Sequence, residues 1–292
     1  MKQLKCWIEA MRLRTLPVSV AGVLTAWAWA LIDGRFDAMP AVLCLAFALL
    51  AQIASNFANE YYDYTAGRDR VGREGPRRGV TEGDITPAAM RKATLVTIGI
   101  AGCVGLSLVA WGGWWLLAVG ALIAVGVFAY STGPYPLSTH GWGEVAVVFF
   151  FGIIPVNLTY YLAAGCWSSE VLLSSVAIGL MGANVLIINN YRDREDDLSV
   201  GKRTLCVRWG RRCMARIYLA DIIIASLLLT VAVIMAGRYE SLVAVVVYLL
   251  LGLKLRALMV RRLGAQLNPL LGGTALSMFA VAVILLVCAA VL

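Results

Sequence analysis

Long apolar segments recur along the whole chain and are separated by short polar ones. Most of them have about 17 to 25 residues, the length that an α-helix needs to cross a hydrocarbon layer of about 30 Å. The pattern therefore predicts an all-α integral membrane protein, built as a bundle of nine transmembrane helices. The predicted spans are residues 15–31, 41–57, 93–110, 114–130, 144–164, 171–188, 215–236, 241–253 and 268–292.

Two of these spans leave alternatives open. The first is short enough to be the apolar core of a signal peptide, because basic residues precede it and Ala28-Trp29-Ala30 loosely resembles a cleavage site. Its Trp-rich sequence lacks a clean segment of small residues, which favours a retained helix. The eighth span is short for a membrane helix unless it continues to Val260.

Composition and charge fit a membrane location. Hydrophobic residues make up 61% of the 292 residues and charged residues 14%, which excludes an ordinary water-soluble domain. With nine spans, all but two of the 25 Lys and Arg residues fall on one side, the exceptions being Arg35 and Arg238. By the positive-inside rule, that side and the N-terminus are cytoplasmic, as in a bacterial inner-membrane protein. The net charge of +8 therefore indicates contact with anionic lipid and requires no nucleic acid.

The chain contains seven cysteines but no C-x-x-C pair. Neither a disulfide framework nor a zinc site is therefore expected. No linker or separate soluble region is apparent, so residues 1–292 are expected to form a single transmembrane domain.

Two acidic motifs follow apolar spans on the predicted cytoplasmic side. The first, NEYYDYTAGRD, places Asn59 and Asp63 four residues apart at the end of the second span. The second, NNYRDREDDLSVGKRT, repeats that spacing with Asn189, Asp193 and Asp197 after the sixth span. Residues four apart lie on the same face of a helix, so each motif is expected to present a stripe of oxygen atoms.

Asp69 does not fit a continuous helix through the first motif. Six residues correspond to about 600° of helical rotation, which places Asp69 about 120° away from Asp63. A helix that ends near Ala66, with Gly67 as its terminating residue, allows the chain to turn and bring Asp69 back toward Asp63.

The side chains in and around both motifs indicate a particular ligand. Asn and Asp supply the hard oxygen ligands that suit Mg²⁺, which often shares its coordination with substrate phosphates. The neighbouring cations suit phosphate oxygens: Arg73, Arg77, Arg78, Lys202 and Arg203. Solvated surface ion pairs, each contributing about 0 to 1 kcal/mol, are the simpler alternative. Because the same device occurs at two helix ends, a metal-bridged diphosphate is the favoured interpretation.

These motifs resemble the UbiA superfamily of intramembrane aromatic prenyltransferases. RLRTLPVSVAG (residues 12–22) is similar to the opening segment of the family, and the two acidic motifs are similar to its Asp-rich motifs. YSTGPYPLSTHGWGE (130–144) is similar to its fourth-to-fifth helix loop, and the wording of these segments is closest to the dihydroxynaphthoate branch. Glu60 stands where Asp is more usual, outside the ligand positions.

The resemblance implies a nine-helix fold with both motifs at the cytoplasmic face, and an activity. The resemblance to the dihydroxynaphthoate branch implies transfer of a polyprenyl group from polyprenyl diphosphate to 1,4-dihydroxy-2-naphthoate, with loss of CO₂ and diphosphate, giving demethylmenaquinone. By the same resemblance Mg²⁺, in two ions, would be held by Asn59, Asp63, Asp69, Asn189, Asp193 and Asp197. The catalytic residues implied are Asp63, Asp193 and Lys202, and the diphosphate ligands are Arg73, Arg77, Arg78, Lys202 and Arg203.

Polar groups within the apolar spans are candidates for the wall of a substrate cavity, because such groups usually face a cavity or a partner helix. For the prenyl or aromatic substrate these are Asn56, Tyr130, Tyr160, Tyr161 and Asn184, with Gln52 and Asn157 as further candidates. Hydrogen bonding between helices is the alternative for each of them. His140 is interpreted as a surface histidine and Asp221 as a packed hydrogen-bonding partner.

Three other functions are alternatives to this one. A UbiA-type enzyme acting on another aromatic acceptor shares all the motifs. An ion-coupled transporter also uses intramembrane Asp and Asn, but here the acids stand at helix ends and no matching halves occur. An enzyme that transfers a phospho-alcohol is disfavoured because its D-G-x-x-A-R opening is missing.

Overall fold

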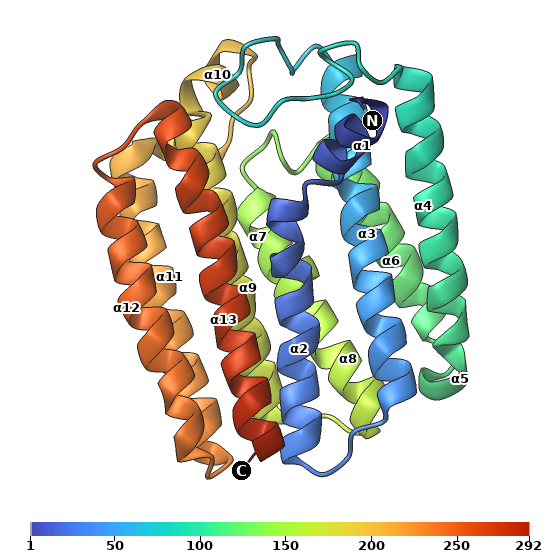
Figure 1. The fold of residues 1–292 in the computed structure, drawn as a ribbon, viewed down its shortest axis with the longest axis vertical. Helices are drawn as coiled ribbons and strands as arrows, with labels where there is room; N and C mark the ends of the chain where they lie inside the picture. Colours follow the sequence, from blue (N-terminus) through green and yellow to red (C-terminus); the bar gives the residue numbers. More distant parts are fainter. Residues whose placement is uncertain (1, 292) are drawn as a thin grey trace.

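A computed structural model describes residues 2–291 of the chain, and within that range it contains helices and no strands (Figure 1). The helices are α1 (Lys2–Met11), α2 (Leu16–Ile32), α3 (Ala38–Thr65), α4 (Pro87–Ser107), α5 (Val109–Gly112), α6 (Leu116–Ser131), α7 (Gly143–Val147), α8 (Ile154–Ala164), α9 (Ser169–Arg192), α10 (Arg194–Ser199), α11 (Leu205–Met235), α12 (Leu242–Met259) and α13 (Asn268–Val291). A π-helical turn, Val148–Ile153, joins α7 to α8. The all-α prediction is confirmed.

Eight helical segments among the described residues are long and apolar enough to cross a membrane. They correspond to eight of the nine spans expected from the sequence. The remaining expected span, 114–130, corresponds to α6, a shorter apolar helix of 16 residues. Helix α12 continues to Met259, so the eighth span has the longer of its two possible lengths.

Side-chain caps mark where several of the long helices begin. The carboxylate of Asp37 accepts a hydrogen bond from the backbone N–H of Met39 at the start of α3. The hydroxyl groups of Thr86, Ser168 and Thr204 do the same at the starts of α4, α9 and α11. Each cap satisfies a backbone donor that the first turn of a helix leaves without a partner.

Small residues allow close packing inside the bundle. A Cβ atom on Gly152 would lie 2.4 Å from the Cα of Gly179, so the backbones around these two glycines are in direct contact. Packing of this kind holds helices together where burial of apolar surface provides no driving force. Helix α2, which contains the first predicted span, packs between α13 and α3 and contributes Trp29 to the buried core (Figure 1).

The segments that carry the acidic motifs lie at the same end of the bundle. The connection between α3 and α4 arches over this end, where α10 also lies (Figure 1). The chain turns at the opposite end between α2 and α3. The two acidic motifs therefore come from helices whose ends point the same way.

Candidate active site

The first acidic motif ends helix α3 as the sequence predicts. The backbone N–H of Gly67 donates to the carbonyl of Tyr64 over 3.0 Å, and that of Arg68 donates to the carbonyl of Asp63 over 2.8 Å. Gly67 has a φ of 67°, in the left-handed region that terminates many helices. Asp69 follows this turn and faces inward, with its side chain only 3% exposed.

The second motif differs in detail from the single continuous helix expected. Helix α9 ends at Arg192, and Asp193 joins it to the short helix α10. The N–H of Asp193 still donates to the carbonyl of Asn189 over 3.0 Å, and that of Asp197 to the carbonyl of Asp193 over 2.8 Å. Each of these bonds joins residues four apart, as in an α-helix. The side chains of Asn189, Asp193 and Asp197 therefore stay on one face despite the bend.

Arg73 connects the two motifs. Its Nη1 donates to Asp69 Oδ1 over 2.8 Å and its Nη2 donates to Asp193 Oδ2 over 3.0 Å. These two carboxylates are 124 positions apart in the sequence numbering but share one guanidinium group. At the outer edge, Arg70 also forms an ion pair with Asp196 of α10.

Lys202 makes a second connection. Its Nζ donates to Asp63 Oδ2 over 3.2 Å and lies 3.8 Å from Asp197 Oδ1. The Lys202 side chain is 13% exposed, so this charge is largely removed from water. The carboxylates of the two motifs thus converge around two basic side chains.

Two arginines outside the predicted site also reach the motifs. Arg12 Nη2 donates to Asn59 Oδ1 over 2.6 Å, from the turn that precedes α2. Arg192 Nε donates to Asp193 Oδ1 over 2.6 Å, and its Nη2 donates to Asn189 Oδ1 over 2.8 Å. Arg12 has a φ of 53°, and it is the only non-glycine residue recorded with a positive φ within residues 2–291.

The remaining predicted cations, Arg77, Arg78 and Arg203, make contacts different from those of Arg73 and Lys202. Arg78 is buried and donates to Asn59 Oδ1 over 3.0 Å. Arg77 is half exposed and pairs with Asp84 at 2.5 Å. The backbone N–H of Arg203 donates to the carbonyl of Thr139 over 2.8 Å, and Arg203 is absent from the residues that line the cavity described next.

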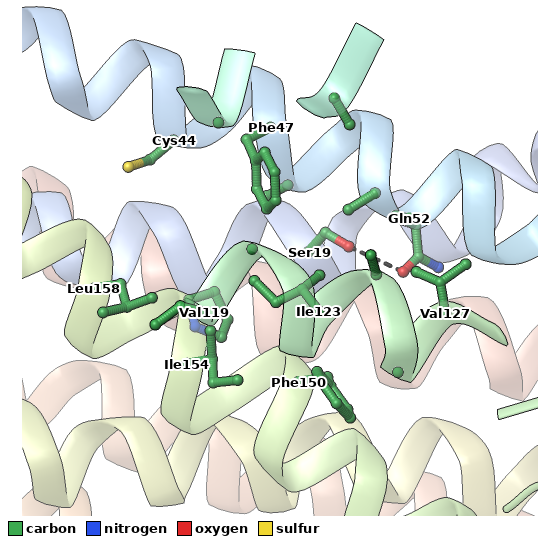
Figure 2. A pocket seen from close by; sticks show the side chains of 18 of the residues that line it. Ser19, Cys44, Phe47, Gln52, Val119, Ile123, Val127, Phe150, Ile154 and Leu158 are labelled. Carbon is green, nitrogen blue, oxygen red and sulfur yellow. Dashed lines mark hydrogen bonds between the residues drawn. The ribbon is translucent and has the colours of Figure 1, made fainter. Parts of the chain in front are cut away.

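A cavity of about 520 Å³, the acidic cavity, opens between the motifs, with Asn59, Asp63, Asn189, Asp193 and Asp197 in its wall. A second, apolar cavity of about 440 Å³ lies among α2, α3, α4, α6 and α8 (Figure 2). The two cavities adjoin because both are lined by Gln52, Tyr130 and Phe151. In Figure 2, Gln52 accepts a hydrogen bond from Ser19 over 3.1 Å at the edge of the apolar cavity.

The polar residues of the spans divide into two groups. Tyr130 and Asn56 line the acidic cavity, and Asn56 also donates to the carbonyl of Met11 over 2.9 Å. Tyr160, Tyr161 and Asn184 line neither of these two cavities.

The second group has structural contacts instead. The Tyr160 hydroxyl donates to Asp33, in the loop at the opposite end of the bundle. The ring of Tyr161 stacks on Trp167 with centroids 4.7 Å apart. Asn184 donates to the carbonyl of Tyr218 on α11 over 3.3 Å. The spacing of polar residues in the sequence does not show which face of each helix lines a cavity.

His140 and Asn157, two other polar residues noted in the sequence, both lie outside the wall of the acidic cavity. His140 is stacked on Tyr135 at 3.9 Å and lies within hydrogen-bonding distance of the Pro136 carbonyl, outside the cavity wall. Asn157 lines a separate shallow pocket with Trp167.

Burial and charge set the protonation of the acidic cluster. Burial raises the pKa of Asp197 to about 7, against the opposing effect of the Lys202 ammonium. Burial also acts on Asp193, but hydrogen bonds and charge from Arg192, together with the charge of Arg73, outweigh it and lower the pKa. Burial raises the pKa of Asp69. The cluster therefore holds carboxyl groups of unequal acidity close together.

The oxygen atoms of the two motifs are the candidate ligands for a divalent metal ion. Within residues 2–291 no three His, Cys, Asp or Glu side chains form a ready metal-binding group. Asp63 Oδ1, however, is buried without a hydrogen-bond partner, and the other donors are Asn and Asp oxygens. Hard oxygen atoms with an unsatisfied lone pair fit Mg²⁺ in chemical type, provided that Lys202 and Arg73 shift to make room.

Comparison with known proteins defines the class. Residues 19–268 match the model of the UbiA prenyltransferase family, and the chain belongs to that family. A UbiA homolog from Aeropyrum pernix K1 has the same fold, with a TM-score of 0.73 at 17% identity over 92% of this chain and 97% of that one. An Archaeoglobus fulgidus homolog described as bound to GPP and Mg²⁺ gives a TM-score of 0.64 at 16% identity, over 95% and 99% of the two chains.

Curated relatives narrow the comparison. The chain is 37% identical over 229 residues to the 1,4-dihydroxy-2-naphthoate octaprenyltransferase of Escherichia coli strain K12, covering 76% of this chain and 74% of the relative. It is 33% identical over 277 residues to the protein of the same name from Mycobacterium leprae strain TN, covering 93% and 92%. The resemblance drawn from the motifs is confirmed.

Proposed function

We propose that this protein transfers a polyprenyl group from polyprenyl diphosphate to 1,4-dihydroxy-2-naphthoate, in the biosynthesis of menaquinone. The observation that carries the proposal is the convergence of two acidic helix ends on one cavity, next to an apolar cavity. The relatives match most of the chain, and the acceptor in their names supports the choice of acceptor here. The single domain, 1–292, would cross the bacterial inner membrane nine times, with the acidic end in the cytoplasm.

Mg²⁺, in two ions, is the cofactor that these donors suit. One ion would be held by Asn59, Asp63 and Asp69, and the other by Asp193 and Asp197 with support from Asn189. When bound, Mg²⁺ supplies positive charge to the diphosphate leaving group. The unpartnered Oδ1 of Asp63 supports its assignment as a ligand.

The basic side chains between the carboxylates would bind the diphosphate directly. Burial alone would lower the pKa of Lys202, but the charges of Asp63 and Asp197 outweigh it and raise that pKa, so the ammonium stays charged. Arg73 keeps its charge for the same reason, because Asp193 and Asp69 outweigh the effect of burial and raise its pKa. After shifting to make room for the metal, both cations would stay beside the diphosphate, where negative charge develops as the C–O bond breaks.

The apolar cavity would receive part of the prenyl chain. Its wall is almost entirely aliphatic and aromatic, apart from a few groups such as Gln52 and Tyr130 at the edge that it shares with the acidic cavity. An allylic cation formed at this edge would be separated from bulk water, and the face of Tyr130 could stabilise it by cation–π attraction.

Transfer activity in isolated membranes tests the proposal. Membranes that contain the protein, supplied with Mg²⁺, a polyprenyl diphosphate and dihydroxynaphthoate, are expected to form a lipid-soluble prenylated naphthoquinol, which is detected as the quinone after oxidation by air. Asp63→Ala is expected to abolish this product, and so is an excess of EDTA. Prenylation of a different aromatic acceptor in preference would contradict the choice of substrate, and diphosphate release without acceptor consumption would contradict transfer itself.

A further inference from the structure

Glu144 is a buried carboxyl group in the wall of the acidic cavity that none of the roles above uses. It lies in the first turn of α7 and is 7% exposed. Its Oε1 accepts a hydrogen bond from Asn190 Nδ2 over 2.9 Å, while its Oε2 is buried without a hydrogen-bond partner. Asn190 is the neighbour of Asn189, so the carboxyl lies beside the second acidic motif.

The hydrogen bond to Asn190 uses only one of the two carboxyl oxygens. A buried acceptor without a partner costs about 1 to 3 kcal/mol, and a hydroxyl group of a ligand in the cavity would remove that cost. Glu60, in the wall of the same cavity, shows the contrast: it accepts from the N–H of Val80 over 3.0 Å and has Arg78 at 3.8 Å. Within residues 2–291, no ion pair to a basic side chain is recorded for Glu144.

The surroundings of Glu144 suit a flat aromatic molecule. Gly143, Val147 and Leu186 give the adjacent wall an apolar character. A Cβ atom placed on Gly143 would lie 3.7 Å from the hydroxyl of Tyr130, so that tyrosine is close by. Since Tyr130 and Val147 also line the apolar cavity, Glu144 lies near the edge at which the two cavities adjoin.

We propose that Glu144 is the general base that accepts a proton from a ring hydroxyl of the aromatic acceptor. The inference rests on the proposed function, and it assigns a catalytic role to a residue that touches the acceptor and neither the diphosphate nor the metal. The free Oε2 receives the proton, and Asn190 fixes the orientation of the carboxyl through Oε1.

The chemistry balances without any further reactant. The ring carbon that bears the carboxylate bonds to C1 of the prenyl group, and the C1–O bond breaks with its electron pair leaving on diphosphate. The adjacent hydroxyl gives its proton to Glu144 and becomes a ketone. The carboxylate is now β to that ketone, so its C–C bond breaks, CO₂ departs and the electron pair forms an enolate. Glu144 returns the proton to the enolate oxygen, giving the prenylated naphthoquinol.

The variants Glu144→Gln and Asp221→Asn form a matched test. Asp221 is also 7% exposed, but it lies in α11 and lines neither of the two cavities. In E144Q, kcat for prenyl transfer is expected to fall by about 10²- to 10⁴-fold, the usual contribution of a general base. D221N is expected to retain kcat to within about threefold. Glu144→Asp keeps a carboxyl group and is expected to recover part of the lost activity.

Binding measurements separate a base from a structural residue. Mg²⁺-dependent binding of a non-hydrolysable allylic diphosphate analogue is expected to be the same in E144Q as in the unchanged protein. Unchanged kcat in E144Q would overturn the assignment, and so would loss of analogue binding or failure of E144D to exceed E144Q. If the unchanged protein itself fails to prenylate dihydroxynaphthoate, the proposed function fails instead, and that result is seen before any variant is measured.

Discussion

Replacement of Lys202 by Met tests the charge arrangement of the site most sharply. The ammonium group lies 3.2 Å from Asp63 and 3.8 Å from Asp197, and its side chain is 13% exposed. Met has a similar length and keeps the packing of the aliphatic part, but it removes the charge. The variant therefore changes what lies between the two motifs while leaving the helices in place.

The size of the effect follows from the contacts. At the effective dielectric near a protein surface, two unit charges about 4 Å apart interact by about 4 kcal/mol, of which desolvation cancels a large part. A hydrogen bond to a charged group contributes about 1.5 to 3 kcal/mol net. Loss of one such bond to the diphosphate corresponds to about a 10- to 150-fold fall in kcat/KM for the donor.

Metal affinity is expected to change in the opposite direction. Without the ammonium group, the carboxylates of Asp63 and Asp197 no longer have a built-in cation to displace. Binding of Mn²⁺ in the absence of donor, followed from the electron paramagnetic resonance signal of the free ion, is therefore expected to tighten in K202M. Lys202→Arg serves as the control, because it retains a positive charge at this position. A K202M protein with unchanged kcat/KM and unchanged Mn²⁺ binding would refute the reasoning.

Three further predictions concern glycines. Gly67→Ala places a side chain at a φ of 67°, costs about 1 to 2 kcal/mol and displaces Asp69, so donor binding measured by titration is expected to weaken. Gly152→Val drives a side chain into Gly179, 2.4 Å from the Cβ position, and is expected to lower the midpoint of thermal unfolding in detergent or to prevent folding. Gly120 lines the apolar cavity and has open space around it, so Gly120→Leu is expected to lower kcat/KM for long prenyl donors more than for short ones. An equal effect on both donors would contradict the placement of the chain.

The sequence predicted those features that depend on local spacing. Apolar runs located the helices, and Gly67 marked the end of α3 because few other residues adopt its backbone conformation. The four-residue spacing of Asn189, Asp193 and Asp197 survived even though a bend divides α9 from α10. Hydrogen bonds between residues close together in the sequence fix such features, and residues far away in the sequence contribute little to them.

Features that depend on packing between helices could not be predicted. Asn56 and Asn184 are both polar residues within apolar spans, but only the first faces the cavity, and only tertiary structure decides the rotation of each helix. In the sequence, Arg12 and Arg192 stand among the basic residues that flank the spans, whereas in the structure both donate hydrogen bonds to side chains of the acidic motifs. Glu144 ends the segment 130–144 that resembles a loop of the family and begins a span, but neither feature indicates that its side chain faces the cavity.

The account depends on two helix ends acting on one diphosphate. A structure determined with Mn²⁺ and a non-hydrolysable polyprenyl diphosphate analogue measures this directly, because the metal positions can be located by anomalous scattering. We expect one diphosphate group whose oxygens share metal ions with Asp63 on one side and Asp193 on the other. A diphosphate bound by only one of the two motifs, or at another place in the bundle, would contradict the account.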